Sequence, residues 1–114
     1  MAVLPRLVRP MLATLHHELP VDQDRDGWEF KWDGVGAITY VSEAAVRLVS
    51  RNDKEIAASY PELGVLAERV DTLVILDGEV VALRGGRPDF EVLQSRMHVR
   101  HPPGRLVEDA PVKL

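Results

Sequence analysis

The chain has 114 residues, no cysteine and a formal net charge of −4. This length suits a single domain, and a chain of this size buries roughly two-thirds of its unfolded surface when it folds. The lack of cysteine excludes a disulfide scaffold, thiolate metal sites and a cysteine nucleophile, and it fits a reducing, cytoplasmic environment. No stretch approaches the ~18 apolar residues of a membrane span, so no membrane partner is expected.

The first third of the chain changes from an irregular pattern to a period of two. Residues 1–27 are expected to form a lead-in segment, because Pro5 and Pro10 interrupt it and residues 22–27 are rich in turn formers. From there aromatic and charged side chains alternate, which predicts a strand with one aromatic face over residues 28–33.

The middle of the sequence predicts an antiparallel meander followed by a helix. Residues 35–41 and 45–50 are expected to be strands, and residues 51–59 a polar loop. Pro61 suits the first turn of a helix, because its missing N–H would have no partner there. Three apolar residues spaced by three and four would share one helix face: Leu63, Leu66 and Val70.

The last third predicts strands around two turns, and then a short helix. Residues 73–76 and 79–83 are expected to be strands separated by a turn or bulge at Asp77-Gly78, and residues 84–87 a second turn. Asp89 can cap a helix that carries Phe90, Leu93 and Met97 inward and ends at residues 101–104, and residues 110–114 open another strand. The predicted class is α+β, with antiparallel β-sheets and flanking helices.

Two charged stretches each allow a structural and a functional interpretation. Residues 84–105 hold five arginines against Asp89 and Glu91, which makes either a solvated loop, favoured on charge alone, or a contact with phosphate backbone. Residues 50–54 make an ordinary polar loop or hold phosphate through Arg51, whose guanidinium pairs well with phosphate oxygens. The four histidines lack a partner cluster with metal-ligand spacing.

Lys31 and Glu79 are the residues with the clearest chemical potential. A lysine between two carboxylates is commonly part of a surface ladder of charges, and this interpretation is favoured from the pattern alone. The alternative is a nucleophilic amine, which burial or cationic neighbours must help to deprotonate. Glu79 follows a turn signal, yet it could enter a cleft near a magnesium ion, which is typically held by one or two carboxylates plus substrate phosphates.

Several ordered blocks resemble the ATP-dependent DNA ligases, within the covalent nucleotidyltransferase superfamily. The blocks that carry the resemblance are residues 29–34 (EFKWDG), 50–52 (SRN) and 76–81 (LDGEVV), with flanking agreement at residues 10–13, 59–63, 88–90 and 93–97. Their order and spacing resemble the bacterial ligases of this kind, including those of end-joining repair. The resemblance implies the front part of the fold shared by DNA ligases and mRNA capping enzymes, with residues 1–114 as a partial adenylation domain: a lead-in at 1–27 and a truncated core at 28–114.

The resemblance also implies a reaction with ATP and magnesium. The lysine at Lys31 attacks the α-phosphate of ATP, which gives lysyl-AMP and pyrophosphate; AMP then passes to a 5′-phosphate at a nick, and the 3′-hydroxyl displaces it. The implied binding residues have separate roles. Glu29 accepts a hydrogen bond from the adenine amino group, Arg51 contacts the ribose side or the DNA, and Glu79 engages the ribose or the metal side. Asp33 and Gly34 shape the turn that presents Lys31.

The implied partners are nicked or broken double-stranded DNA, end-joining repair proteins and the missing part of the ligase. Two departures from the family pattern qualify the active-ligase interpretation. Gly36 stands where the family usually has an arginine that holds the ribose, and the family's later motifs and OB-fold domain are not within residues 1–114. An inactive remnant or interaction module is therefore the alternative, with an RNA ligase or capping enzyme ranked lowest.

Overall fold

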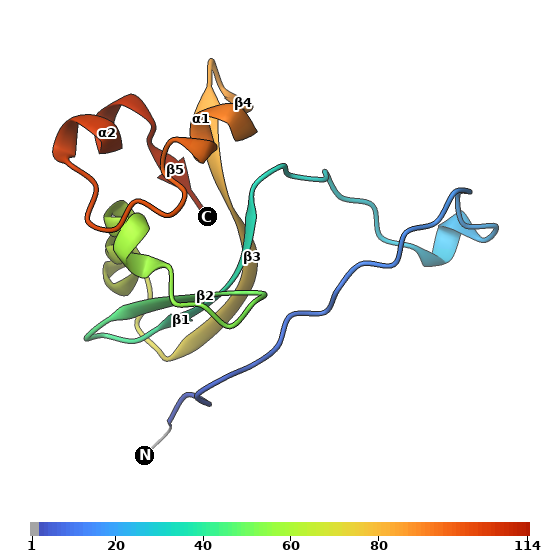
Figure 1. The fold of residues 1–114 in the computed structure, drawn as a ribbon. Coiled ribbons are helices and arrows are strands. Elements are labelled where there is room, and N and C mark those ends of the chain that lie inside the picture. Colours follow the sequence, from blue (N-terminus) through green and yellow to red (C-terminus); the bar gives the residue numbers. More distant parts are fainter. Residues whose placement is uncertain (1–2) are drawn as a thin grey trace.

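The computed structural model describes residues 3–114 as an α+β fold around one antiparallel sheet (Figure 1). This confirms the predicted class. The strand order is β2-β1-β3-β4, and β5 pairs with β3. The strands are β1 (Val35–Val41), β2 (Val46–Ser50), β3 (Val74–Arg84), β4 (Arg87–Pro88) and β5 (Val112–Lys113). The helices are α1 (Phe90–Gln94), α2 (Gly104–Asp109) and the 3-10 helices η1 (Gln23–Arg25), η2 (Ala57–Ser59) and η3 (Pro61–Glu68).

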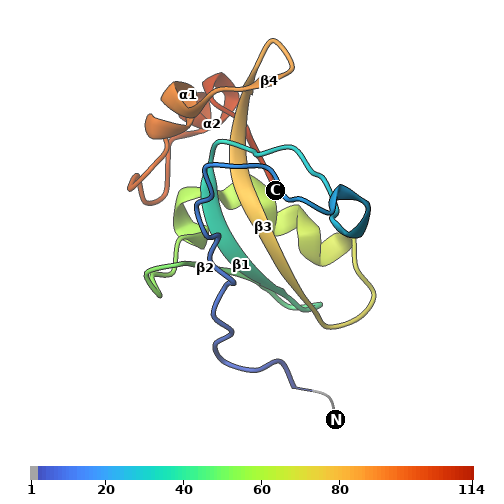
Figure 2. The same cartoon turned by 90° about the vertical axis from the view of Figure 1, so that its right-hand side faces the viewer.

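The helices η3 and α1 pack on one face of the sheet, where they bury the main core (Figure 2). Side chains alternate between the two faces of a strand, so alternate positions of β1 and β3 turn toward these helices. The buried residues of this core are Ala37, Leu48, Tyr60, Leu63, Val80, Ala82, Leu93 and Val112. Leu63 and Leu93 therefore lie inward as the helical spacing predicted, with Phe90 and Met97 packed beside them.

The N-terminal lead-in covers part of the opposite face. Leu4 packs against the cluster of Ile38, Tyr40 and Val49. The backbone N–H of Val8 donates to the Tyr40 hydroxyl at 2.6 Å, and the Arg47 guanidinium lies 4.1 Å from the centre of the Tyr40 ring. The lead-in is therefore attached to the sheet near its start, whereas the segment 11–33 extends away from the body (Figure 1) and is exposed at residues 11–22 and 24–33.

Arg96 is fully buried beneath the helical layer and joins several elements. Its two terminal nitrogens donate to the Glu62 carboxylate at 2.8 and 2.7 Å, and also to the carbonyls of Ala110 and Ser59. The same carboxylate accepts from the backbone N–H of Val112 in β5. One guanidinium thus connects α1's end to η2, η3 and the C-terminal strand. Arg96 belongs to the basic stretch 84–105, but it stabilises the fold and does not form a surface contact for phosphate.

Two local predictions were wrong. Residues 28–33 form no strand, and the side chains of Trp28, Phe30 and Trp32 are exposed at 60%, 85% and 49%. The alternation was correct, but no strand within residues 3–114 pairs with this segment, and a strand needs a ladder partner. Asp77-Gly78 is not a turn either. Both residues lie inside β3, since their pairing with Ile38 and Ala37 outweighs the local turn propensity.

The other elements agree closely with the sequence. The two meander strands are confirmed, and so are the 84–87 turn and the strand at the C-terminal end. Asp89 caps α1 as predicted, because its side chain accepts from the Val92 N–H at 3.1 Å. Helix α1 ends at Gln94, earlier than predicted, and α2 was not predicted. Within residues 3–114 no helix has both the length and the apolar character needed to cross a bilayer.

Candidate active site

Glu79 is the centre of the candidate site, on the sheet face opposite the helices. It pairs across the ladder with Gly36, and paired residues of neighbouring strands project to the same face. A Cβ atom added at Gly36 would lie 3.6 Å from Glu79 Oε2, which is an ordinary contact distance. The missing side chain at position 36 therefore leaves open space directly beside a half-buried carboxylate.

Gly34 fixes the path of the chain that precedes β1. A Cβ atom there would lie 2.0 Å from the carbonyl oxygen of Val80 and 2.9 Å from the side chain of Val81. No residue with a side chain can approach β3 this closely, so the glycine of the predicted motif is required by packing. Through this contact, the segment that carries Lys31 is attached to the strand that carries Glu79.

The charges around Glu79 show which predicted residues the fold brings together. Burial raises the pKa of the Glu79 carboxyl above its usual value, and the carboxylates of Asp33 and Asp77 add to this effect. The amine of Lys31 and the backbone N–H of Gly34 oppose it, and the net direction is upward. Lys31, Asp33 and Asp77 are thus close enough to Glu79 for their charges to act on its carboxyl, although no ion pair within residues 3–114 joins Lys31 to Glu79.

Two predicted binding residues do not join this group. Glu29 is exposed in the irregular segment before Lys31, and Arg51 is exposed in the turn after β2. Within residues 3–114, no hydrogen bond or ion pair connects either of them to Glu79. Arg51 follows Ser50, which pairs with Ala37, so it lies one residue beyond the ladder on the side of Gly36. The sheet therefore has the order Arg51, Gly36, Glu79 across it.

Lys31 does not have the burial that would help to deprotonate its amine. Its side chain is exposed, and the cavities of about 190 and 380 Å3 are lined by other residues. The smaller cavity lies between β2 and η3, and the larger one lies between the end of β3 and the helices α1 and α2. The neighbouring Trp28 and Trp32 are exposed as well, so they do not shield the lysine from water.

The carboxylates at and near Glu79 are suited to hold a magnesium ion only together with the phosphates of a bound substrate. Within residues 3–114, no group of three or more histidine, aspartate or glutamate side chains could hold a metal. Glu79 and Asp77 are nonetheless close enough for one charge to raise the pKa of the other. Magnesium is held by one or two carboxylates plus substrate phosphates in nucleotide enzymes, and this donor set fits that arrangement.

Sequence reasoning missed the role of Arg96. It was read as one of five arginines in a basic stretch, although the structure makes it the most buried charged side chain of that stretch. The signal was present, because Arg96 follows Leu93 by three positions and Leu93 follows Phe90 by three. Positions spaced by three and four would share a face of the predicted helix. The helix ends at Gln94, but the Arg96 N–H donates to the Leu93 carbonyl at 2.9 Å, so this turn continues the helical path and keeps Arg96 inward.

Comparisons with known proteins agree on one family. A model of the family described as "ATP dependent DNA ligase domain" matches residues 10–114. The "Multifunctional non-homologous end joining DNA repair protein LigD" of Mycobacterium tuberculosis (strain ATCC 25618 / H37Rv) is 40% identical over 89 residues, which cover 76% of this chain and 12% of that protein. "DNA ligase C2" of Mycolicibacterium smegmatis is 39% identical over 98 residues, covering 84% of this chain and 26% of that protein.

Solved structures give the same result for the fold. A mycobacterial DNA ligase D complexed with ATP and MES aligns with a TM-score of 0.60 at 37% identity, over 75% of this chain and 26% of that one. The ligase domain of LigD from M. tuberculosis aligns with a TM-score of 0.56 at 40% identity, over 63% of this chain and 25% of that one. The chain thus spans between about an eighth and about a quarter of the length of these relatives.

Proposed function

The chain belongs to the ATP-dependent DNA ligase domain family, and from this we propose that it is the front part of an adenylation domain that joins DNA strand breaks through lysyl-AMP. The observation that best supports the proposal is that Gly34 attaches the segment of Lys31 to β3, where the charge of Lys31 acts on the Glu79 carboxyl. The two residues come from separate sequence blocks, 29–34 and 76–81.

In this proposal Lys31 is the nucleophile. Its neutral amine attacks the α-phosphate of ATP, so that a nitrogen–phosphorus bond forms, the bond to the pyrophosphate oxygen breaks, and the amine loses a proton. AMP then passes to the 5′-phosphate at a break, and the 3′-hydroxyl displaces AMP to seal the strand. Phosphoryl transfer of this kind depends mostly on positioning and on stabilising the charge of the phosphates.

The other residues would bind the nucleotide. Glu29 would accept from the adenine amino group, Arg51 would contact the ribose or the DNA phosphate, and Asp33 with Gly34 would hold Lys31 in place. Glu79 would bind the ribose or, with Asp77, a magnesium ion that neutralises phosphate charge when bound. The domain assignment that accompanies this proposal is a lead-in at residues 1–27 and part of the catalytic core at residues 28–114.

The proposal also names partners and a compartment. The substrate is nicked or broken double-stranded DNA, and end-joining repair proteins and the remaining part of a ligase are the protein partners. A cytoplasmic location fits a protein that acts on bacterial DNA. The names of the relatives support the DNA substrate, and the name of LigD also supports end-joining repair.

A second candidate is a catalytically inactive ligase remnant or interaction module. Two observations favour it: Gly36 lacks the family arginine, and the structure brings carboxylates rather than cations to Lys31. We therefore predict that this 114-residue polypeptide by itself does not accumulate lysyl-AMP at a useful rate. Loss of one well-placed electrostatic contact in such sites costs ~100–1,000-fold in rate, and several of the family's contacts are not within residues 1–114.

The deciding experiment is incubation with magnesium and ATP labelled at the α-phosphate, followed by measurement of protein-bound label. The wild type is compared with Lys31→Ala, and with Lys54→Ala as a control for an exposed lysine outside the site. Label on the wild type and the control but not on Lys31→Ala would show a working adenylating unit and exclude the remnant interpretation. If no label is found, the ligase proposal is tested next by joining the chain to the remaining part of a related ligase. Failure of Lys31 to become labelled there would reject it.

A further inference from the structure

The tip of the β3–β4 hairpin carries two arginines that face each other. Arg84 and Arg87 are the last cross-strand pair, and the two residues between them are Gly85 and Gly86. Both glycines have positive φ angles, 57° and 78°, as a tight hairpin turn with the right-handed twist requires. The hairpin projects beyond the helices at one end of the molecule (Figure 1).

The pairing of Arg84 with Arg87 lowers the stability of the hairpin, and the fold does not require it. Like charges directly opposite each other on neighbouring strands are destabilising, so a cross-strand arginine pair is an unfavourable choice for stability. Asp89 compensates only one of the two, through an ion pair of 3.4 Å with Nε of Arg84. Within residues 3–114 no ion pair involves Arg87. Arg87 is therefore an exposed cation at the tip that has no ion-pair partner within residues 3–114.

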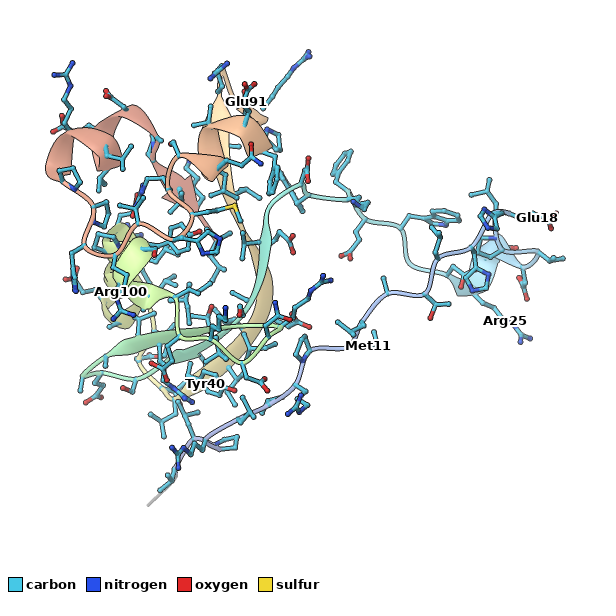
Figure 3. The ribbon with its side chains drawn as sticks, viewed as in Figure 1. Met11, Glu18, Arg25, Tyr40, Glu91 and Arg100 are labelled. Atoms are coloured by element: carbon cyan, nitrogen blue, oxygen red, sulfur yellow. The ribbon has the colours of Figure 1, made fainter. Side chains whose placement is uncertain are left out.

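The remaining arginines of the basic stretch do not extend this surface. Arg96 is buried against Glu62, and Arg105 on α2 lies 3.8 Å from the carboxylate of Asp109. Arg100 lies beside the 3-10 helices, well away from Glu91 of α1 at the hairpin end (Figure 3). The hairpin tip thus pairs two exposed arginines across the strands: Arg84 has an ion-pair partner, and Arg87 has none within residues 3–114.

We propose that the tip formed by Arg84, Gly85, Gly86 and Arg87 binds the phosphate backbone of double-stranded DNA. Two guanidinium groups on adjacent strands can pair with phosphate oxygens, and the glycines between them allow a close approach because they have no side chain. The arginine pair of the hairpin supports a site for phosphate groups. That these groups belong to DNA rather than to another polyanion rests on the proposed ligase function.

The hairpin tip and Glu79 lie on the same strand, so their separation shows which part of the DNA the tip would contact. Five residues of β3 separate Glu79 from Arg84, which corresponds to roughly 17 Å of extended strand. The tip therefore lies away from the proposed reaction site near Glu79. The hairpin would therefore contact the backbone of the duplex beside the break rather than the reacting phosphate.

The test is fluorescence anisotropy of a labelled nicked duplex of 24 base pairs, titrated with the whole chain between 25 and 200 mM salt. The hairpin variant is Arg84→Ala with Arg87→Ala, and the charge-matched control is Arg100→Ala with Arg105→Ala. A third variant, Arg87→Ala alone, leaves the Arg84–Asp89 ion pair in place. Circular dichroism and thermal melting verify that each variant is folded.

We expect the hairpin variant to bind roughly tenfold more weakly at 50 mM salt. The slope of log affinity against log salt concentration should fall in magnitude by about two for this variant and by about one for Arg87→Ala. The control should keep nearly the wild-type affinity. Equal losses in both double variants, tighter binding of a matched RNA duplex, or no binding by the wild type at 25 mM salt would each overturn the proposal. Because labelling of Lys31 by ATP is measured separately, a failure of the hairpin and a failure of the ligase chemistry are distinguishable.

Discussion

Gly34 and Gly36 are two positions apart, yet they have no side chain for different reasons. Gly34 approaches β3 so closely that a Cβ atom would overlap the Val80 carbonyl oxygen, whereas Gly36 has free space beside Glu79. The first glycine is fixed by packing, and the second is a replacement that the backbone does not require. This difference leads to opposite expectations for the two substitutions.

Gly34→Ala should destabilise the fold. Its Cβ would lie 2.0 Å from backbone, which cannot move aside as a flexible side chain can, so the Lys31 segment must detach or the strand must shift. Overpacking of this kind costs about 1–3 kcal/mol, which urea denaturation can measure. Gly64→Ala is the matched control, since a Cβ there meets nothing within 4 Å and should change stability little. Equal stability of both variants would contradict the close approach.

Gly36→Arg should raise the affinity for ATP. The added side chain has room beside Glu79, at the position where the resemblance to the ligases implies an arginine that holds the ribose. A single charge-assisted hydrogen bond contributes ~1.5–3 kcal/mol at best, so an increase of about tenfold or somewhat more is expected by calorimetry. Gly36→Gln provides a side chain of similar reach without the charge. If the arginine and glutamine variants bind ATP equally, position 36 is not the ribose position.

Among the elements, the network around Arg96 has the largest structural consequence. It joins the carboxylate of Glu62 in η3 to the guanidinium after α1 and to the backbone of β5. Breaking a buried pair by removing one partner typically costs about 3–5 kcal/mol, because the other charge stays buried without compensation. The short helices, of five and eight residues, are therefore held by this network and by core packing more than by their own hydrogen bonds.

The same network predicts a loss of stability in acid. Burial raises the pKa of the Glu62 carboxyl, but hydrogen bonds from Arg96 and the backbone outweigh it and lower the pKa below 4.5. A lowered carboxyl pKa adds stability that is present above the unfolded value and is lost as the pH falls through the folded value. Urea midpoints between pH 6 and pH 3 should therefore fall more steeply for the wild type than for Glu62→Gln. Parallel curves would show that the carboxylate does not contribute in this way.

Glu79 on β3 should show the opposite dependence. Burial, with Asp33 and Asp77, raises its pKa, so the folded state binds a proton more tightly than the unfolded state. Its contribution to stability is complete below the unfolded value of about 4.5 and declines as the pH rises through the higher folded value. Glu79→Gln should therefore gain stability relative to the wild type between pH 4 and pH 7. Residues that lower stability at working pH are candidates for function, which agrees with the proposed role.

For the whole molecule, the exposed segment 11–33 is the most unusual feature. Large apolar side chains on it are exposed almost without exception: Met11, Leu12, Leu15, Leu19, Val21, Trp28, Phe30 and Trp32. Monomeric proteins rarely expose so many apolar groups together, and such surfaces favour association. The radius of gyration of 15.8 Å is larger than the roughly 13 Å expected of a compact domain of about this size, which agrees with an extended segment.

We expect this chain by itself to self-associate through that segment. Sedimentation velocity between 5 and 200 µM should show dimers or larger species at the higher concentrations. Replacement of Trp28, Phe30 and Trp32 by serine should shift the population toward monomer, because these side chains do not belong to the core. The control is replacement of exposed Glu43 and Asp71 by serine, away from the segment. A wild-type monomer at all concentrations would contradict the prediction.

The sequence by itself determined the family, the α+β class, the meander strands, the cap at Asp89 and the Arg84–Arg87 turn. These features depend on local patterns: alternation, helical spacing, and residues that fit one backbone conformation. Only the tertiary structure decided the rest. It continued β3 through Asp77-Gly78 because β1 pairs with it, left residues 28–33 unpaired, and buried Arg96 against Glu62. It also brought Lys31 close enough for its charge to act on the Glu79 carboxyl. Each of these outcomes depends on residues far apart in the chain, whose contacts contribute more free energy than the local preference does.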